Sequence, residues 1–79
     1  MSKRYRPVLT KCWIRFLKSL GCHFKRQKSS HHVWYCPGTK RSIVFRGEEK
    51  EIPAFHIKTN LKTLEIDEVK FWEWIDKNC

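Results

Sequence analysis

The spacing of the apolar residues changes at Gly21, and this change constrains the fold more than any other feature of the chain. Before it, four apolar residues keep the spacing of one helical face, namely Trp13, Phe16, Leu17 and Leu20. This pattern predicts an amphipathic helix of about three turns. Thr10 is suited to cap its start and Gly21 to end it.

Beyond this glycine the side chains alternate in character, which predicts a half-buried strand over residues 22–27. The polar residues 28–30 connect it to a second strand at residues 31–36. A tight turn follows at residues 37–39, because proline fixes φ and glycine readily adopts a positive φ. With a third strand at about residues 41–46, the segment predicts an antiparallel meander.

The last third of the chain predicts two more helices. Residues 47–51 form a charged loop, and Pro53 suits the first turn of a helix. The apolar stripe of that helix consists of Ile57, Leu61 and Leu64. A further helix begins near Asp67, which can cap it. Its aromatic residues predict either deep packing or an exposed surface for a partner.

We therefore expect one domain of the α+β class, since 79 residues are too few for two cores. The expected architecture is an α-β-β-β-α sandwich, with both long helices on one face of a three-stranded antiparallel sheet. Residues 1–9 would be a basic N-terminal arm, residues 10–66 the main domain, and residues 67–79 a C-terminal helical extension.

Alternation along the second strand assigns its two histidines to opposite faces of the sheet. His31, Val33 and Tyr35 fall on one side, and the other side holds His32, Trp34 and Cys36. Trp34 is the natural core residue. We therefore expect His31 on the open face and His32 facing the core with a hydrogen bond.

The charge is divided unevenly along the chain. The first 46 residues contain 12 Lys or Arg and no acidic residue, whereas the remaining residues contain 5 Lys and 8 Asp or Glu. A basic half with aromatic residues favours nucleic acid over a membrane as the partner, because no long basic helix has a uniform apolar face. A surface that only maintains solubility is the alternative, but it explains 46 residues without a carboxylate poorly.

No stretch of the sequence is typical of a signal peptide or a membrane span, so we expect a cytoplasmic protein. The four cysteines are Cys12, Cys22, Cys36 and Cys79. They include no Cys-x-x-Cys pair, and a reducing compartment would keep them as thiols.

Residues 25–36 combine cationic side chains, hydroxyls and two adjacent histidines, which indicates proton-transfer chemistry on a polyanion. An alternative is a zinc site built from Cys22, His31, His32 and Cys36. Its spacing matches no common metal motif, and its residues divide between the two faces of the sheet. His23 and His56 have no partner pattern and are expected on the surface.

An ordered set of motifs resembles the HicA (YcfA-like) toxins. The family signature is Gly-Ser-His-His followed by an apolar pair, and this chain has Ser30-His31-His32 followed by Val33-Trp34. The signature follows a helix that ends in Leu-Gly and a strand with the sequence Arg-Gln-Lys at residues 26–28. The similarity continues through Pro-Gly at residues 37–38, the third strand, and Lys-Glu-Ile-Pro at residues 50–53. It covers roughly residues 10–66.

The resemblance implies a fold related to double-stranded RNA-binding domains and a metal-independent ribonuclease acting on messenger RNA, with no cofactor. It also implies a type II toxin–antitoxin system in which a HicB antitoxin neutralises the enzyme. The family's essential histidine corresponds to His31. This chain departs from the family in its basic N-terminal arm, in its aromatic C-terminal helix, and in Ser29, which replaces a glycine although serine tolerates positive φ less well.

The chemistry of RNA is compatible with this implication. RNA carries its own nucleophile, the 2′-hydroxyl, so cleavage requires placement, a proton acceptor or donor, and positive charge near the phosphate. We expect His31 to be the single acid or base. The candidate contacts to RNA and its phosphates are Lys25, Arg26, Lys28, Ser29, Ser30 and Tyr35. The alternatives are a non-catalytic RNA-binding module of the same fold and an inactive family member retained for its protein partner.

Overall fold

The computed structural model describes residues 6–79 of the chain. In chain order its elements are β1 (Val8–Leu9), α1 (Thr10–Ser19), β2 (His23–Lys28), β3 (His31–Tyr35), β4 (Ile43–Phe45), β5 (Glu51–Ile52), α2 (Ala54–Leu64) and α3 (Glu68–Asn78). The strands form a three-stranded antiparallel sheet in the order β2-β3-β4 and a separate antiparallel pair, β1 with β5. The predicted α+β class and three-stranded sheet are confirmed.

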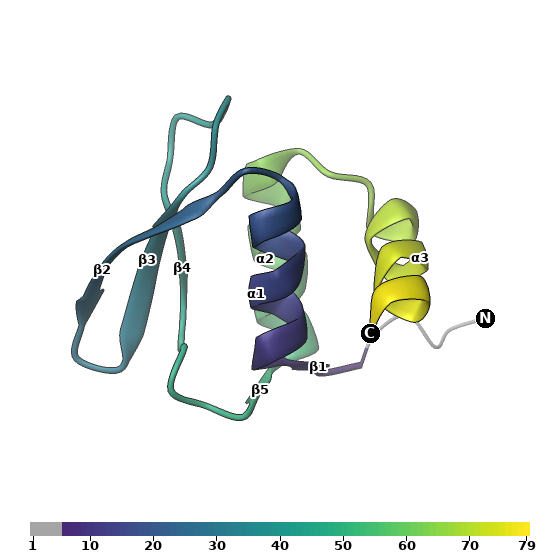
Figure 1. Ribbon diagram of the computed structural model, residues 1–79, viewed down its shortest axis with the longest axis horizontal. Coiled ribbons are helices and arrows are strands. Elements are labelled where there is room, and N and C mark those ends of the chain that lie inside the picture. The colour runs from purple at the N-terminus through teal and green to yellow at the C-terminus, as the bar shows by residue number, and fades with distance from the viewer. Residues whose placement is uncertain (1–5) are drawn as a thin grey trace.

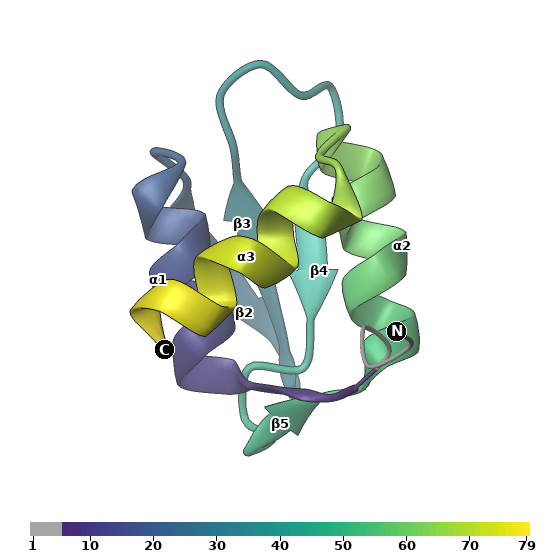
Figure 2. The ribbon, with the colours of Figure 1, turned by 90° about the vertical axis from the view of Figure 1, so that its right-hand side faces the viewer.

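The elements stack in layers. Figure 1 shows α1 and α2 on one side of the sheet, with α3 farther away on the same side. In Figure 2, α3 crosses in front of α1 and α2, and the sheet lies behind them. The other face of the sheet therefore carries no helix of the described residues and lies on the opposite side of the molecule from α3. None of the helices in the described part of the chain is long and apolar enough to cross a membrane.

Aromatic rings from three layers meet in the core. Trp13 of α1 is fully buried and packs edge-on against Phe45 of β4 and Phe71 of α3, with ring centroids 6.2 and 5.6 Å apart. Phe16 of α1 lies 4.8 Å from the ring of Phe71. Edge-to-face contacts at these distances are favourable for aromatic pairs. The C-terminal helix thus packs deeply, the first of the two outcomes that its aromatic residues predict.

The predicted start and end of α1 are confirmed, whereas the predicted cap by Thr10 is wrong. Gly21 has φ 86°, and the backbone N–H groups of Gly21 and Cys22 donate to the carbonyls of Lys18 and Leu17, which forms a Schellman motif. At the other end, Leu9 is the N-cap, and no side chain among the described residues caps the helix. The Thr10 hydroxyl instead donates to the Glu49 carbonyl at 2.6 Å, so it ties α1 to the segment before β5.

Pairing of β1 with β5 is a feature that the periodicity did not predict. Val8 lies opposite Ile52, and both side chains are buried. The predicted basic arm therefore ends in a strand, and the predicted charged loop ends in β5. Arg6 stacks over the ring of Trp72 at 4.6 Å and pairs with Asp76 of α3. Residues 1–5 of the predicted arm lie outside the described residues.

All four cysteines are paired, so the expectation of free thiols is wrong. Cys22 bonds to Cys36, with their Cα atoms 4.1 Å apart, and Cys12 bonds to Cys79, with their Cα atoms 6.0 Å apart. The first disulfide joins the chain just before β2 to the chain just after β3. The second joins α1 to the end of the chain. Sequence spacing cannot give such connectivity, because it depends on which segments meet after folding.

The prediction of a half-buried first strand is wrong, because every residue of β2 is exposed. This strand is an edge of the sheet, and its pairing with β3 shifts register between Phe24 and Arg26. A bulge therefore falls at Lys25. The cap at Asp67 is confirmed, since its side chain accepts a hydrogen bond from the Val69 backbone at 3.1 Å.

Candidate functional site

A two-residue turn between β2 and β3 positions His31 at the start of its strand. Ser29 in this turn has φ 59°, so a serine occupies the left-handed conformation that glycine adopts without strain. The turn sets the register that places Lys28 opposite His31. Ser30 is half-buried beside it.

The pairing register confirms that the two histidines face opposite ways, because directly paired residues of antiparallel strands share a face. His31 pairs with Lys28, and Val33 pairs with Arg26 and Val44. Val33 is buried but does not belong to the core, and Val44 is 47% exposed. These residues therefore lie on the open face of the sheet.

His32 instead faces the helices. It pairs with Phe45 in the register, and the two rings lie 5.8 Å apart. Its Nε2 is 3.8 Å from Glu48 Oε2, too far for a hydrogen bond, and its buried Nδ1 has no hydrogen-bond partner among residues 6–79. The predicted core-facing position is confirmed, but the predicted hydrogen bond is not found in the described chain. A Cβ at Gly47 would overlap the His32 ring, so this glycine permits the close packing.

The other predicted contact residues are spread along the β2-β3 hairpin. Arg26 shares the open face with His31, whereas Lys25 occupies the bulge. Tyr35 is 42% exposed and its ring contacts that of His23 at 5.3 Å. Four residues of strand separate Tyr35 from His31, which is about 13 Å. The hairpin thus brings Lys28, Ser29 and Ser30 close to His31 and places Tyr35 at the far end of the same face.

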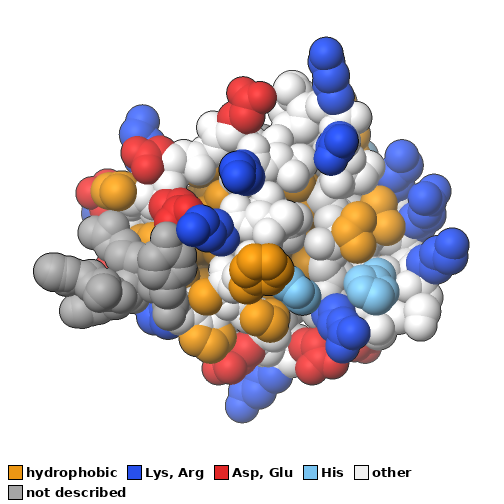
Figure 3. All heavy atoms as spheres, turned by 180° about the vertical axis from the view of Figure 1, so that it is seen from behind, with side chains coloured by type: hydrophobic (Ala, Val, Ile, Leu, Met, Phe, Trp, Pro, Cys, Tyr) orange, Lys and Arg blue, Asp and Glu red, His pale blue; other side chains and the backbone are white. Residues whose placement is uncertain are grey.

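A hollow of about 260 Å³ opens beside His31, between the sheet and α2. It is lined by His31, Val44, Phe45, Arg46, Phe55, His56, Thr59 and Asn60. Figure 3 shows histidine side chains next to an exposed hydrophobic patch, with Lys and Arg side chains around them. The hollow therefore combines imidazole, guanidinium and aromatic groups on one surface.

Seven of the eight residues that line this hollow were not predicted as site residues. Arg46, Phe55 and His56 are among these seven, and all three are exposed. Arg46 follows β4, and continuing the register by one position puts it opposite His31, on the side away from Lys28. The antiparallel pairing could have indicated it. Phe55, which is 73% exposed, and His56 come from the first turn of α2. Their approach to His31 depends on helix packing, and no local pattern signals it.

A buried side-chain amide joins α2 to β4 beside this hollow. Asn60 is 8% exposed, and its Nδ2 donates to the Val44 carbonyl at 3.3 Å. This bond satisfies a carbonyl of β4, the edge strand of the sheet that α2 packs against. The position of α2 beside the open face is thereby fixed. Arg46 also lies 4.0 Å from Glu49, an exposed contact that stabilises little.

The zinc arrangement left open by the sequence is not formed. Cys22 and Cys36 bond to each other, and His31 and His32 face opposite sides of the sheet. Within residues 6–79, no three or more His, Cys, Asp or Glu side chains cluster in a way that could hold a metal ion.

The chain matches a known protein family. A family model described as HicA toxin of bacterial toxin-antitoxin matches residues 13–66, more than half of the chain. The matched part contains the β2-β3 hairpin, β4 and α2, and so includes every residue that lines the hollow. No curated protein and no solved structure matches the chain.

Proposed function

Since the chain belongs to the HicA toxin family and is the toxin of a toxin–antitoxin system, we propose that it is a metal-independent endoribonuclease that cleaves messenger RNA. The observation that carries this proposal is the setting of His31. Its imidazole is exposed on the open face, with Lys28 opposite it on β2 and Arg46 beside it after β4. A proton carrier between two cations suits a reaction at a phosphodiester.

In the proposed reaction the 2′-oxygen of a ribose attacks the adjacent phosphorus and the bond to the 5′-oxygen of the next nucleotide breaks. A proton leaves the 2′-hydroxyl, and another is added to the departing 5′-oxygen. His31 serves one of these transfers as the single acid or base, and water serves the other. The products are a 2′,3′-cyclic phosphate and a 5′-hydroxyl.

The cations around His31 have a separate role, which is to bind the phosphate oxygens. Arg46 offers a planar group with several donors, whereas Lys28 offers a flexible point charge. As negative charge builds on the phosphorus oxygens, both interactions strengthen. Arg26 lies two residues before Lys28 on the same face, and Lys25 lies at the bulge. Both side chains would hold neighbouring phosphates. Ser29, Ser30 and Tyr35 supply hydrogen bonds and a stacking surface along the hairpin.

The proposed antitoxin is HicB-like and acidic where it meets this surface. Covering Lys25, Lys28 and His31 would block the phosphate site directly, and opposite charges would speed association. Protection mapping of the complex should therefore locate the antitoxin on the β2-β3 hairpin. Protection confined to α3, on the other side of the molecule, would contradict this mode of inhibition.

The test of the proposed function is RNA cleavage by purified protein in excess chelator. The parent protein should cut RNA under these conditions, and His31→Ala should lower the rate by about 10²- to 10⁴-fold. His23→Ala is the matched control, because His23 is also exposed on the hairpin but lies at its other end. Equal cleavage by the parent and His31→Ala would refute the assignment, and binding without any cleavage by the parent would support a non-catalytic RNA-binding module.

A further inference from the structure

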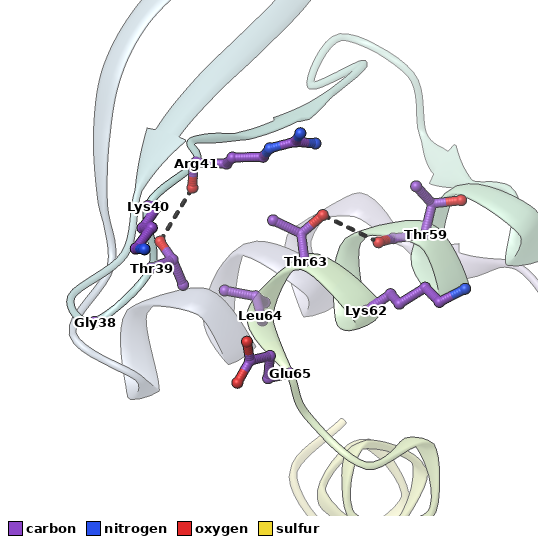
Figure 4. A pocket seen from close by; sticks show the side chains of 9 residues that line it. All are labelled: Gly38, Thr39, Lys40, Arg41, Thr59, Lys62, Thr63, Leu64 and Glu65. Carbon is purple, nitrogen blue, oxygen red and sulfur yellow. Dashed lines mark hydrogen bonds between the residues drawn. The ribbon is translucent and has the colours of Figure 1, made fainter.

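A second and larger hollow, of about 620 Å³, lies farther along α2. One wall is the loop between β3 and β4, and the other is the C-terminal half of α2 (Figure 4). Its lining residues are Gly38, Thr39, Lys40, Arg41, Thr59, Lys62, Thr63, Leu64 and Glu65. Thr59 also lines the hollow at His31. The two hollows therefore adjoin at Thr59, and together they are here called the α2 groove.

The walls of the far hollow carry an excess of positive charge. Lys40, Arg41 and Lys62 contribute three cations, against the single carboxylate of Glu65, and all four residues are exposed. In Figure 4 the Arg41 side chain extends from the loop toward the helix that carries Thr59 and Thr63. This arrangement suits a linear polyanion better than a small neutral molecule.

The loop that carries these cations is held in shape before any ligand binds. Gly38 has φ 85° in a turn closed by a hydrogen bond from the Thr39 backbone to the Cys36 carbonyl. The Thr39 hydroxyl also contacts the carbonyls of Cys36 and Arg41, at 2.9 and 3.0 Å. The disulfide between Cys22 and Cys36 anchors the start of the loop. A preorganised loop loses less conformational entropy on binding.

The α2 groove runs far enough along the helix to hold an RNA strand that continues past the cleaved bond. His56 lines the near hollow and Thr63 the far one, and seven residues of helix separate them by about 10 Å. Phe55 at the near end offers an exposed ring on which a base can stack. A phosphodiester at His31 would thus leave the flanking nucleotides over the remainder of the groove.

We propose that the α2 groove binds the single-stranded RNA that flanks the cleaved phosphodiester, with Arg41 and Lys62 holding its phosphates. This inference rests on the proposed ribonuclease function, because that function places an RNA strand at His31. The groove extends the RNA surface from the hairpin to a second wall made by the helix. An acidic segment of the antitoxin is the competing occupant of the same cations.

The test measures binding in a His31→Ala background, so that cleavage does not disturb it. Arg41→Gln with Lys62→Gln should raise the Kd for an RNA of about twelve nucleotides roughly tenfold. It should also reduce the magnitude of the negative slope of log K against log salt by about 1.4. A dinucleotide, whose single phosphodiester would lie at His31, should bind as before. Lys18→Gln with Lys70→Gln is the matched control, since it removes two exposed cations from α1 and α3.

Two outcomes would overturn the groove proposal. One is an unchanged affinity and salt slope for the longer RNA, with or without weaker antitoxin binding. The other is an equal loss for the dinucleotide or for the control pair, which would indicate a general effect of net charge. Cleavage by the parent protein is measured separately. If the parent does not cut RNA yet binding depends on Arg41 and Lys62, the proposed function fails and the groove remains as an RNA-binding surface without a cleaved bond beside it.

Discussion

The two faces of the β2-β3-β4 sheet differ in what surrounds their side chains. On the helix side, Trp34 and Phe45 belong to a core that includes rings from α1 and α3. On the open side, Arg26, Lys28 and His31 are exposed to solvent. Interactions that stabilise the fold are thus concentrated on one face, and groups able to react with a phosphate on the other. Two neighbouring histidines are therefore expected to have different roles.

The largest expected effect on stability comes from the helix side of the sheet, where a disulfide joins α1 to the residue after α3. Cys79→Ser removes the disulfide to Cys12, which closes a segment of 67 residues. On the chain-entropy account, its loss costs about 4 kcal/mol of unfolding free energy. Thermal or denaturant unfolding of the variant and the parent under oxidising conditions measures this difference. Below the unfolding transition, RNA cleavage should persist, and a loss of cleavage by a folded variant would show that the two faces are coupled.

His32→Ala tests the core-facing side directly. The His32 ring packs between Phe24 and Phe45, with centroids 5.3 and 5.8 Å away. Its removal leaves a cavity, so we expect a loss of about 1 to 3 kcal/mol in unfolding free energy. Thermal melts give the change, and cleavage measured well below the midpoint should stay within a few-fold of the parent. A variant as stable as the parent but inactive would reverse the roles of the two histidines.

His56→Gln sharpens the comparison within the open side. His56 lines the hollow with His31, but the proposed mechanism uses one imidazole. We expect the cleavage rate to fall by about tenfold or less, because glutamine keeps a hydrogen-bonding group for RNA. The measurement compares the single-turnover cleavage rates of His56→Gln and His31→Ala. A loss as large as that of His31→Ala would indicate that two histidines share the proton transfers.

Ser29→Gly has the smallest expected effect, and it should stabilise the protein. Ser29 has φ 59°, where glycine avoids the strain of a β-carbon. We expect a gain of about 0.5 to 1 kcal/mol in unfolding free energy. Chemical denaturation compares the two proteins, with Ser30→Gly as the control because no positive φ is found there. Destabilisation by Ser29→Gly would mean that the serine side chain makes a contribution that outweighs its backbone strain.

Features decided by neighbouring residues could be predicted from the sequence. The stop of α1 at Gly21, the turn at Pro37 and Gly38, and the opposite faces of His31 and His32 all follow from local backbone preference or strand alternation. Features decided by distant segments could not. The pairing of β1 with β5 and the two disulfides require contacts that no periodicity encodes.

The candidate site likewise has one part that could be predicted from the sequence and one part that could not. The hairpin side, with Lys28 and His31, lies in one continuous stretch whose composition already indicates phosphate chemistry. The helix side, with Phe55 and His56, meets His31 only because α2 packs beside β4 through Asn60. A single polar residue in an apolar helix stripe does not reveal which strand it will contact.

The two neighbouring histidines have different proposed roles, since His31 would act in cleavage and His32 would support the fold. The direct measurement is RNA cleavage in excess chelator, with thermal melts of the same samples, for His31→Ala and His32→Ala. We expect His31→Ala to melt like the parent and to cut RNA about 10²- to 10⁴-fold more slowly, and we expect His32→Ala to melt lower and still cut RNA. Unchanged cleavage by a folded His31→Ala, or loss of cleavage only through unfolding, would contradict these roles.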